Sequence, residues 1–146
     1  MDRKDVTKMN IITAAALLAI SFRATTPDFS TVEEYSDLWL TAHLIAGEAQ
    51  CCDNTEQRYV ASVAWNRVKD DRFPDTLMGV IYQDNPIQYA CTVDGNFYRE
   101  PTQENWENAQ YIIDNGSVLP DEVVWQSDCV QGNGEYTRTS WHVYSY

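Results

Sequence analysis

Glu48 is the side chain of this 146-residue sequence best placed for acid chemistry. It lies near the end of the stretch 35–49, in which apolar residues recur at the spacing of one helix face. These residues are Leu38, Trp39, Ala42, Ile45, Ala46 and Ala49. Burial in such a segment disfavours the charged form of a carboxyl group, so the pKa of Glu48 should rise. We therefore expect Glu48 to hold a proton near neutral pH and to act as a general acid.

Two further carboxylates, Asp53 and Glu56, follow Glu48 closely in the sequence. They matter because glycosidases usually use two carboxyl groups, one as the acid and one as the nucleophile or base. Both residues stand at the expected start of the next helix, where acidic side chains are favoured by the helix dipole. We expect both to be solvated, which leaves Glu48 without a well-placed second carboxylate.

Residues 1–24 resemble a targeting segment. Basic residues precede an uncharged apolar run over 11–20 that is too short to span a bilayer comfortably, as in a signal peptide. The only small-x-small triplet ends at Ser21 and makes a weak cleavage site, so an uncleaved membrane anchor is the alternative. We expect a secreted or cell-envelope protein in which residues 25–34 are a linker and residues 35–146 are one folded domain.

The exported part of the chain is strongly acidic. The whole sequence has 10 basic and 22 acidic side chains, and the part from residue 25 onward keeps 6 and 20 of them, a net charge of −14. Binding to a nucleic-acid backbone requires cationic patches, so nucleic acid is excluded as a partner. A polyanionic ligand would have to be held by hydrogen bonds and stacking.

Four cysteines indicate disulfides rather than a metal site. An even number of cysteines in an exported chain suggests disulfide pairing. A bond between the adjacent Cys51 and Cys52 would be strained, so each should pair with Cys91 or Cys129. Our preferred pair is Cys52 with Cys91. The cysteines and the two histidines lack zinc-ligand spacing, so we expect no metal and no cofactor.

Periodicity and turn signals predict an α+β fold, mainly helical with a small C-terminal antiparallel sheet. Helices are expected over 35–49, 56–69, 76–83 and 102–116, and strands over 123–127 and 141–144. Residues 84–101 have no clear period and form a long loop, which is often where function lies. On the second helix, Asn66 and Arg67 are more suited to supporting the fold than to binding a ligand.

Five segments in the same order resemble the SleB-type cell-wall hydrolase family, which includes the spore-cortex-lytic enzymes. They are Leu44-Ile-Ala-Gly-Glu-Ala49, Val60-Ala-Ser-Val-Ala-Trp-Asn-Arg-Val-Lys69, Arg72-Phe-Pro-Asp-Thr76, Gly79-Val-Ile-Tyr-Gln83 and His142-Val-Tyr144. The likeness covers about residues 37 to 146. It implies a lysozyme-like catalytic domain over 35–146 that acts on the glycan strands of peptidoglycan.

The resemblance also implies a reaction. Family members are typically lytic transglycosylases that cut between N-acetylmuramic acid and N-acetylglucosamine, with a catalytic glutamate in a small residue-Glu-Ala triplet. Gly47-Glu48-Ala49 matches that triplet. The chain departs from the spore enzymes at Cys52, where they have a second acidic residue, and at Ile87-Gln88, where a Gly-Gln pair is common. A muramidase and a wall-binding module without activity are the alternatives.

Four residues in segments that match the family are candidate substrate contacts. Aromatic rings can stack on sugars, and amide or imidazole groups can hydrogen-bond acetamido groups. The candidates are Gln88, Tyr89, His142 and Tyr144. For Tyr144, packing in the core of a strand is an equally good interpretation.

Overall fold

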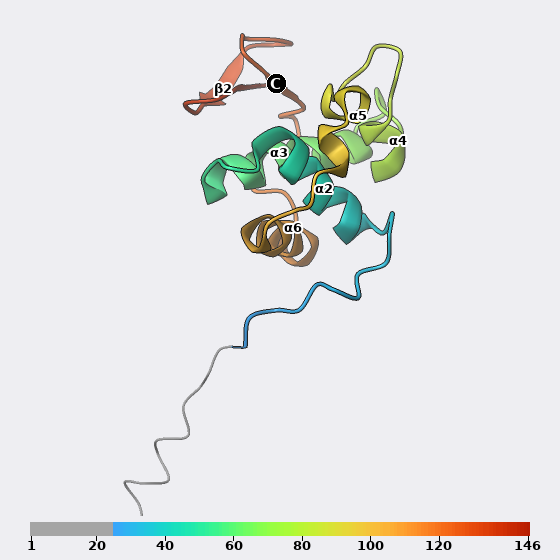
Figure 1. Cartoon of the computed structure of the whole chain (residues 1–146). Helices are drawn as coiled ribbons and strands as arrows, with labels where there is room; N and C mark the ends of the chain where they lie inside the picture. Colours follow the sequence, from blue (N-terminus) through green and yellow to red (C-terminus); the bar gives the residue numbers. More distant parts are fainter. Residues whose placement is uncertain (1–24) are drawn as a thin grey trace, which may run out of the picture.

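The structure, a computed structural model, describes residues 25–146, so the predicted signal peptide or anchor at residues 1–24 lies outside the described residues. The helices are α2 (Asp37–Ala49), α3 (Asn54–Lys69), α4 (Leu77–Ile81), α5 (Cys91–Asp94), the 3-10 helix η1 (Asn96–Tyr98) and α6 (Gln103–Asn115). The strands are β1 (Trp125–Ser127), β2 (Glu135–Arg138) and β3 (Val143–Ser145). Figure 1 shows the sheet and α6 at opposite ends of the helical body. The predicted α+β class is confirmed.

Helices α2 and α3 form the centre of the fold. Ser36 begins α2 by accepting a hydrogen bond from the Trp39 amide at 3.3 Å, and Asp53 begins α3 by accepting one from the Glu56 amide at 2.9 Å. Such caps satisfy an amide of the first turn that has no partner within the helix. Helix α3 starts two residues before the predicted position because Asp53 is its cap.

Helix α6 covers the outer side of this centre. Thr102 and Asn105 form a capping box at its start, and Gly116 follows its last residue at φ 81. Its buried residues pack against α2 and α3; this part of the core contains Ala42, Ile45, Ala61, Trp106, Ala109 and Ile112. The predicted helix over 102–116 is thus confirmed, together with its start and stop signals.

The long loop between α4 and α6 contains two short helices that were not predicted. Gly95, at φ 86, separates α5 from η1 in the left-handed conformation that glycine adopts at little cost. Phe97 on η1 is fully buried and belongs to the main core. Helices of four and three residues are too short to show a hydrophobic period, so the sequence pattern could not reveal them.

The three strands form an antiparallel sheet in the order β1-β3-β2. Trp125 and Glu135 both lie opposite Ser145, on either side of the central strand. Strand β2 was not predicted, because it is mostly exposed and lies where the glycines indicated a turn. Strand β3 begins two residues later than expected, which leaves His142 just before it.

Asn66 and Arg67 join α3 to the segment that leads into the sheet. Asn66 Nδ2 donates to the carbonyl oxygens of Pro120 and Val123 at 2.7 and 2.9 Å. Arg67 Nε donates to the carbonyl oxygen of Val124 at 2.7 Å. Both side chains are buried, and their predicted role in supporting the fold is confirmed.

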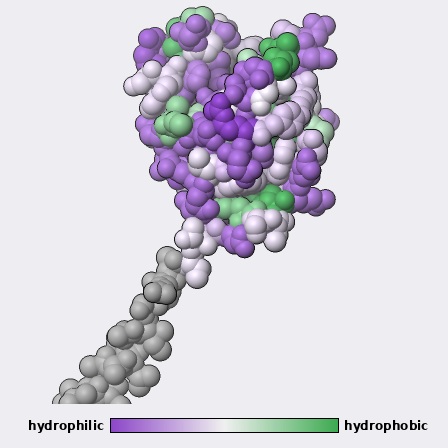
Figure 2. Space-filling view, viewed as in Figure 1, coloured by the Kyte–Doolittle hydropathy of each residue, from purple (hydrophilic) through white to green (hydrophobic). Residues whose placement is uncertain are grey.

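One face of the molecule and the lengths of its helices bear on contact with a membrane. Figure 2 shows a face covered mostly by hydrophilic residues, with hydrophobic residues in small separate groups. Among residues 25–146, no helix is long and apolar enough to cross a bilayer.

Candidate active site

Glu48 lies in the last turn of α2 and is half-buried, so its carboxylate reaches solvent. When Glu48 is ionised, its charge acts on three neighbours. It adds to the effect of burial in raising the pKa of Cys91 and of Tyr89, and it helps to raise the pKa of His142. Glu48 therefore lies close to Tyr89 and Cys91 of the long loop and to His142, the residue just before β3. The burial predicted for Glu48 is thus only partial.

Gly47 allows the long loop to approach α2 directly beside Glu48. A Cβ atom at position 47 would lie 2.9 Å from Cys91 Cβ, 3.0 Å from Cys91 Sγ and 3.3 Å from Phe97 Cα. Contacts this short are not tolerated between real side chains, so only glycine fits. The small residue that precedes Glu48 thus sets how closely α5 and η1 pack against the candidate acid.

Glu56 is fully buried, which corrects the prediction that it is a solvated residue at a helix start. Its Oε1 atom accepts hydrogen bonds from His142 Nδ1 at 2.5 Å and from the Tyr144 hydroxyl at 2.8 Å. Burial acts to raise the pKa of Glu56, but hydrogen bonds from His142, Thr139 and Tyr144 outweigh it and lower the pKa. Asp53, in contrast, is exposed as predicted, and its side chain caps α3.

His142 connects this buried carboxylate to the surroundings of Glu48. Its side chain is 23% exposed, and the hydrogen bond from Nδ1 to Glu56 is the main reason that its pKa is raised. The charge of Glu48 acts in the same direction. His142 is therefore the one candidate contact that lies near Glu48, has a fixed ring orientation and retains exposed surface.

Two of the four predicted substrate contacts are buried and need correction. Tyr89 is 1% exposed, and Tyr144 is 0% exposed with its hydroxyl bound to Glu56. Neither ring has a free face on which a sugar could stack, so the interpretation of Tyr144 as a core residue is the right one. Gln88 is half-buried, and its side-chain amide donates to the Pro86 carbonyl oxygen at 3.2 Å.

The predicted disulfide between Cys52 and Cys91 is wrong in this structure, because Cys51, Cys52, Cys91 and Cys129 are all free thiols. Cys91 is buried against Gly47 and near Glu48 instead of being bonded to the turn after α2. An even count and spacing along the chain cannot show which way a thiol points. In the described part of the chain, no cluster of three or more His, Cys, Asp or Glu residues could hold a metal.

A hollow beside His142 is lined by Trp141, a residue that was not predicted from the sequence to contact the substrate. It measures about 210 Å³, and its walls include Thr139, Ser140, Trp141 and His142. Trp141 is 46% exposed, so part of its indole surface is free for stacking. The position of Trp141 next to His142 in the sequence could have suggested this role, because exposed aromatic side chains commonly form sugar-binding surfaces.

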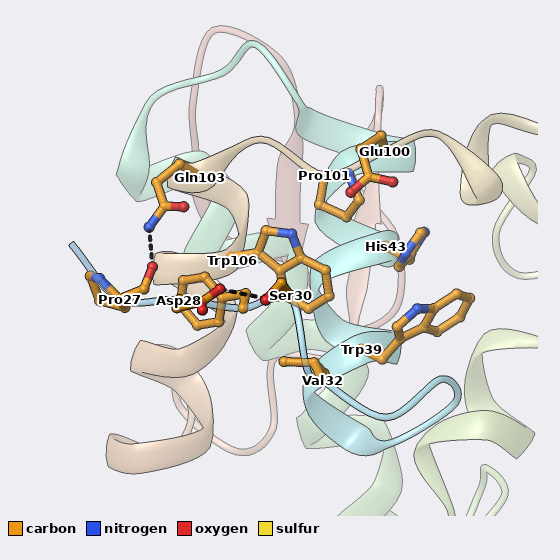
Figure 3. Close-up of a pocket in the computed structure, with 11 residues that line it drawn as sticks. Pro27, Asp28, Ser30, Val32, Trp39, His43, Glu100, Pro101, Gln103 and Trp106 are labelled. Carbon is orange, nitrogen blue, oxygen red and sulfur yellow. Dashed lines mark hydrogen bonds between the residues drawn. The ribbon is translucent and has the colours of Figure 1, made fainter.

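A second cavity, of about 420 Å³, lies away from Glu48. Figure 3 shows Trp39 and His43 of α2 facing Trp106 of α6 and the segment that precedes α2. This segment, expected to be a linker, is attached by a hydrogen bond from Gln103 Nε2 to the Pro27 carbonyl oxygen. The cavity therefore lies where the N-terminal segment packs against the helical body, and Glu48 is not among the residues that line it.

The sequence of this chain matches a known protein family. The sequence profile described as Cell Wall Hydrolase matches residues 53–137, more than half of the chain. The chain belongs to this family. Glu48 and His142 lie just outside the matched range, on either side of it, whereas Glu56 lies within it.

Curated relatives and solved structures agree with this assignment. A spore cortex-lytic enzyme of Oceanobacillus iheyensis is 35% identical over 81 residues, 54% of this chain and 29% of the relative. One from Bacillus subtilis is 31% identical over 68 residues, 47% of this chain and 22% of the relative. The chain thus spans less than a third of the length of these relatives.

The similar solved structures are isolated catalytic domains, and this chain covers nearly the whole length of each. The catalytic domain of the germination-specific lytic transglycosylase SleB from Bacillus anthracis has a TM-score of 0.64 and 20% identity over 78% of this chain and 97% of that one. The catalytic domain of the Bacillus cereus SleB protein has a TM-score of 0.64 and 22% identity over 82% and 98%. At these identities the likeness establishes the fold.

Proposed function

We propose that the protein is a lytic transglycosylase that cuts the bond between N-acetylmuramic acid and N-acetylglucosamine in peptidoglycan, with Glu48 as its general acid and base. The observation that carries this proposal is the position of Glu48 in the last turn of α2, half-buried and close enough to His142 for its charge to help raise the pKa of that histidine. Membership of the cell-wall hydrolase family and the likeness to the SleB catalytic domains support it.

The proposed reaction needs only one carboxyl group. Glu48 in its acid form gives its proton to the bridging oxygen, and the bond from that oxygen to C1 of the muramic acid breaks. Glu48, now a carboxylate, takes the proton of the muramic acid 6-hydroxyl as that oxygen bonds to C1. The attack occurs within one sugar, so the high effective concentration of an intramolecular nucleophile favours it. The product carries a 1,6-anhydro ring, and Glu48 regains its proton.

The surroundings of Glu48 favour this reaction over hydrolysis. A muramidase would need a second carboxylate that contacts the sugar or activates a water molecule. Glu56 is fully buried, with Oε1 bound to His142 and Tyr144, and Asp53 caps α3. Neither side chain is available for that second role.

Substrate recognition would rest on hydrogen bonds and stacking. The acidic chain does not attract polyanions, so the glycan would be bound through its hydroxyl and acetamido groups. We assign such hydrogen bonds to His142 and Gln88, and a stacking surface to Trp141. Because this substrate lies outside the cytoplasm, we place the protein in the cell envelope or the medium.

Incubation of the purified full-length chain with purified peptidoglycan tests the proposal. We expect the turbidity of the suspension to fall as soluble glycan fragments are released. A wall-binding module without activity would instead sediment with the peptidoglycan and leave its turbidity unchanged. That result, obtained with folded protein, would contradict the proposed function.

A further inference from the structure

The carboxylate of Glu56 has no part in the proposed reaction, yet it is fully buried in the fold. Placing a carboxylate away from water is unfavourable unless hydrogen bonds or a counter-charge compensate. Here two donors converge on one oxygen, His142 Nδ1 at 2.5 Å and the Tyr144 hydroxyl at 2.8 Å. The carboxylate is therefore an acceptor held in place by β3 and the residue just before it.

This arrangement fixes the orientation of the His142 ring. Nδ1 is directed to Glu56, so Nε2 is the ring nitrogen left for solvent or substrate. The ring remains 23% exposed and lines the hollow that also contains Trp141. The buried end of the imidazole is thus occupied, and the exposed part of the ring borders the hollow.

The charges around His142 are mostly negative. Glu56 faces it from α3, Glu48 from α2 and Asp128 from the segment between β1 and β2. Arg138 lines the same hollow, but its guanidinium is paired with the carboxylate of Glu135. The phenol of Tyr144 contributes a hydrogen bond to Glu56 and no charge, because burial raises the pKa of Tyr144.

We propose that Glu56 is a positioning residue that, together with Tyr144, holds His142 as an imidazolium whose Nε2–H donates a hydrogen bond to the sugar bound beside Glu48. The inference rests on the proposed function, because that function supplies the sugar. An imidazolium donates through both nitrogens, whereas a neutral ring that donates through Nδ1 can only accept through Nε2. The buried carboxylate therefore determines whether His142 presents a donor or an acceptor.

The pH dependence follows from the direction of the shift. The pKa of His142 is raised above its ordinary value of 6.5, mainly by the hydrogen bond to Glu56. The imidazolium then persists at pH values where an unperturbed histidine would be neutral. As the pH rises through the raised pKa, Nε2 loses its proton and the donor disappears. Activity should therefore fall on the alkaline side at the pKa of His142.

Nitrogen NMR of the full-length chain tests the proposal without any substrate. The chain has two histidines, and His43 serves as an internal reference because burial lowers its pKa while Nδ1 donates to the Phe97 carbonyl oxygen. We expect His142 to be protonated on both nitrogens and to titrate above 6.5. In Glu56→Gln, the amide oxygen can still accept from Nδ1, and the His142 pKa should fall. His142 titrating at or below 6.5 in the wild type, or unchanged in the variant, would overturn the proposal.

Kinetics of the same variant distinguish positioning from a merely structural role. At pH 7 we expect Glu56→Gln to lose roughly tenfold to a hundredfold in kcat/KM, the usual effect of losing a hydrogen bond from a charged donor. Its alkaline limb should move to lower pH. Glu122→Gln makes the same change at an exposed site and should match the wild type. A lower melting temperature with an unchanged pH profile would mean that Glu56 only stabilises the fold.

The wild-type titration and the Tyr144→Phe variant test the proposal even if Glu56→Gln fails to fold. If Glu56→Gln does not fold, the wild-type titration of His142 still decides the proposal. Tyr144→Phe retains the Glu56–His142 hydrogen bond and should keep His142 charged; a neutral His142 in that folded variant would overturn it. An active Glu48→Gln variant would contradict the proposed function but would not change the titration of His142. Failure of the proposed function can therefore be told apart from failure of the inference about Glu56.

Discussion

Replacing Glu48 with Gln should abolish the clearing of peptidoglycan, with a loss of at least about 10²-fold in rate. Gln has nearly the same shape as Glu, but its amide cannot give a proton to the bridging oxygen or take one from the 6-hydroxyl. Because Glu48 is half-exposed, the substitution should leave the thermal unfolding midpoint close to that of the wild type. Clearing rates and unfolding curves of the full-length proteins provide the measurement.

Asp53→Asn is the matched control for this variant. It makes the same carboxylate-to-amide change five residues later, at an exposed position. Asn is a good helix cap, so the start of α3 should be preserved. We expect this variant to clear peptidoglycan at nearly the wild-type rate. A Glu48→Gln protein that was as active as the Asp53→Asn control would remove Glu48 from the mechanism.

Replacing Gly47 with Ala should damage both the stability and the activity of the protein. The added methyl group would meet Cys91 Cβ at 2.9 Å and the backbone of Phe97 at 3.3 Å, so α5 and η1 would have to move away from α2. Overpacking of this kind typically lowers the free energy of unfolding by about 1–3 kcal/mol. Because these segments adjoin Glu48, the clearing rate should also fall, by roughly tenfold or more.

A second substitution tests whether this close approach is the cause. Cys91→Gly removes both the Cβ and the Sγ atoms that the new methyl group would meet. Gly47→Ala should therefore lower the free energy of unfolding less when Cys91 is already replaced by Gly than it does in the wild type. Denaturant unfolding of the four proteins measures this coupling. Independent, additive effects would show that Gly47 is not needed for the contact with Cys91.

Local signals allowed the sequence to predict the main helices. The cap at Thr102, the stop at Gly116 and the apolar faces of α2 and α3 all depend on neighbours within a few residues. The same signals located Glu48 in the last turn of a helix. They failed for α5 and η1, which are too short for a period to appear.

The residues around Glu48 are brought together by contacts between positions far apart in the sequence, and no local pattern could predict these contacts. Glu56 resembles an ordinary acidic residue in the first turn of a helix, and it is buried because His142 and Tyr144 reach it from 86 and 88 residues further along the chain. Tyr89 lies in a loop segment that suggested a binding surface, but its ring faces the core. In each case burial was set by tertiary packing.

The mass of the muramic acid ends released by the wild-type protein tests the central claim most directly. Full-length protein is incubated with purified peptidoglycan, and the soluble fragments are analysed by mass spectrometry. With Glu48 acting alone, the muramic acid should carry a 1,6-anhydro end, which is lighter than a reducing end by one water molecule. Fragments that all carry hydrated, reducing ends would contradict the transglycosylase mechanism and identify a muramidase that uses water as the nucleophile.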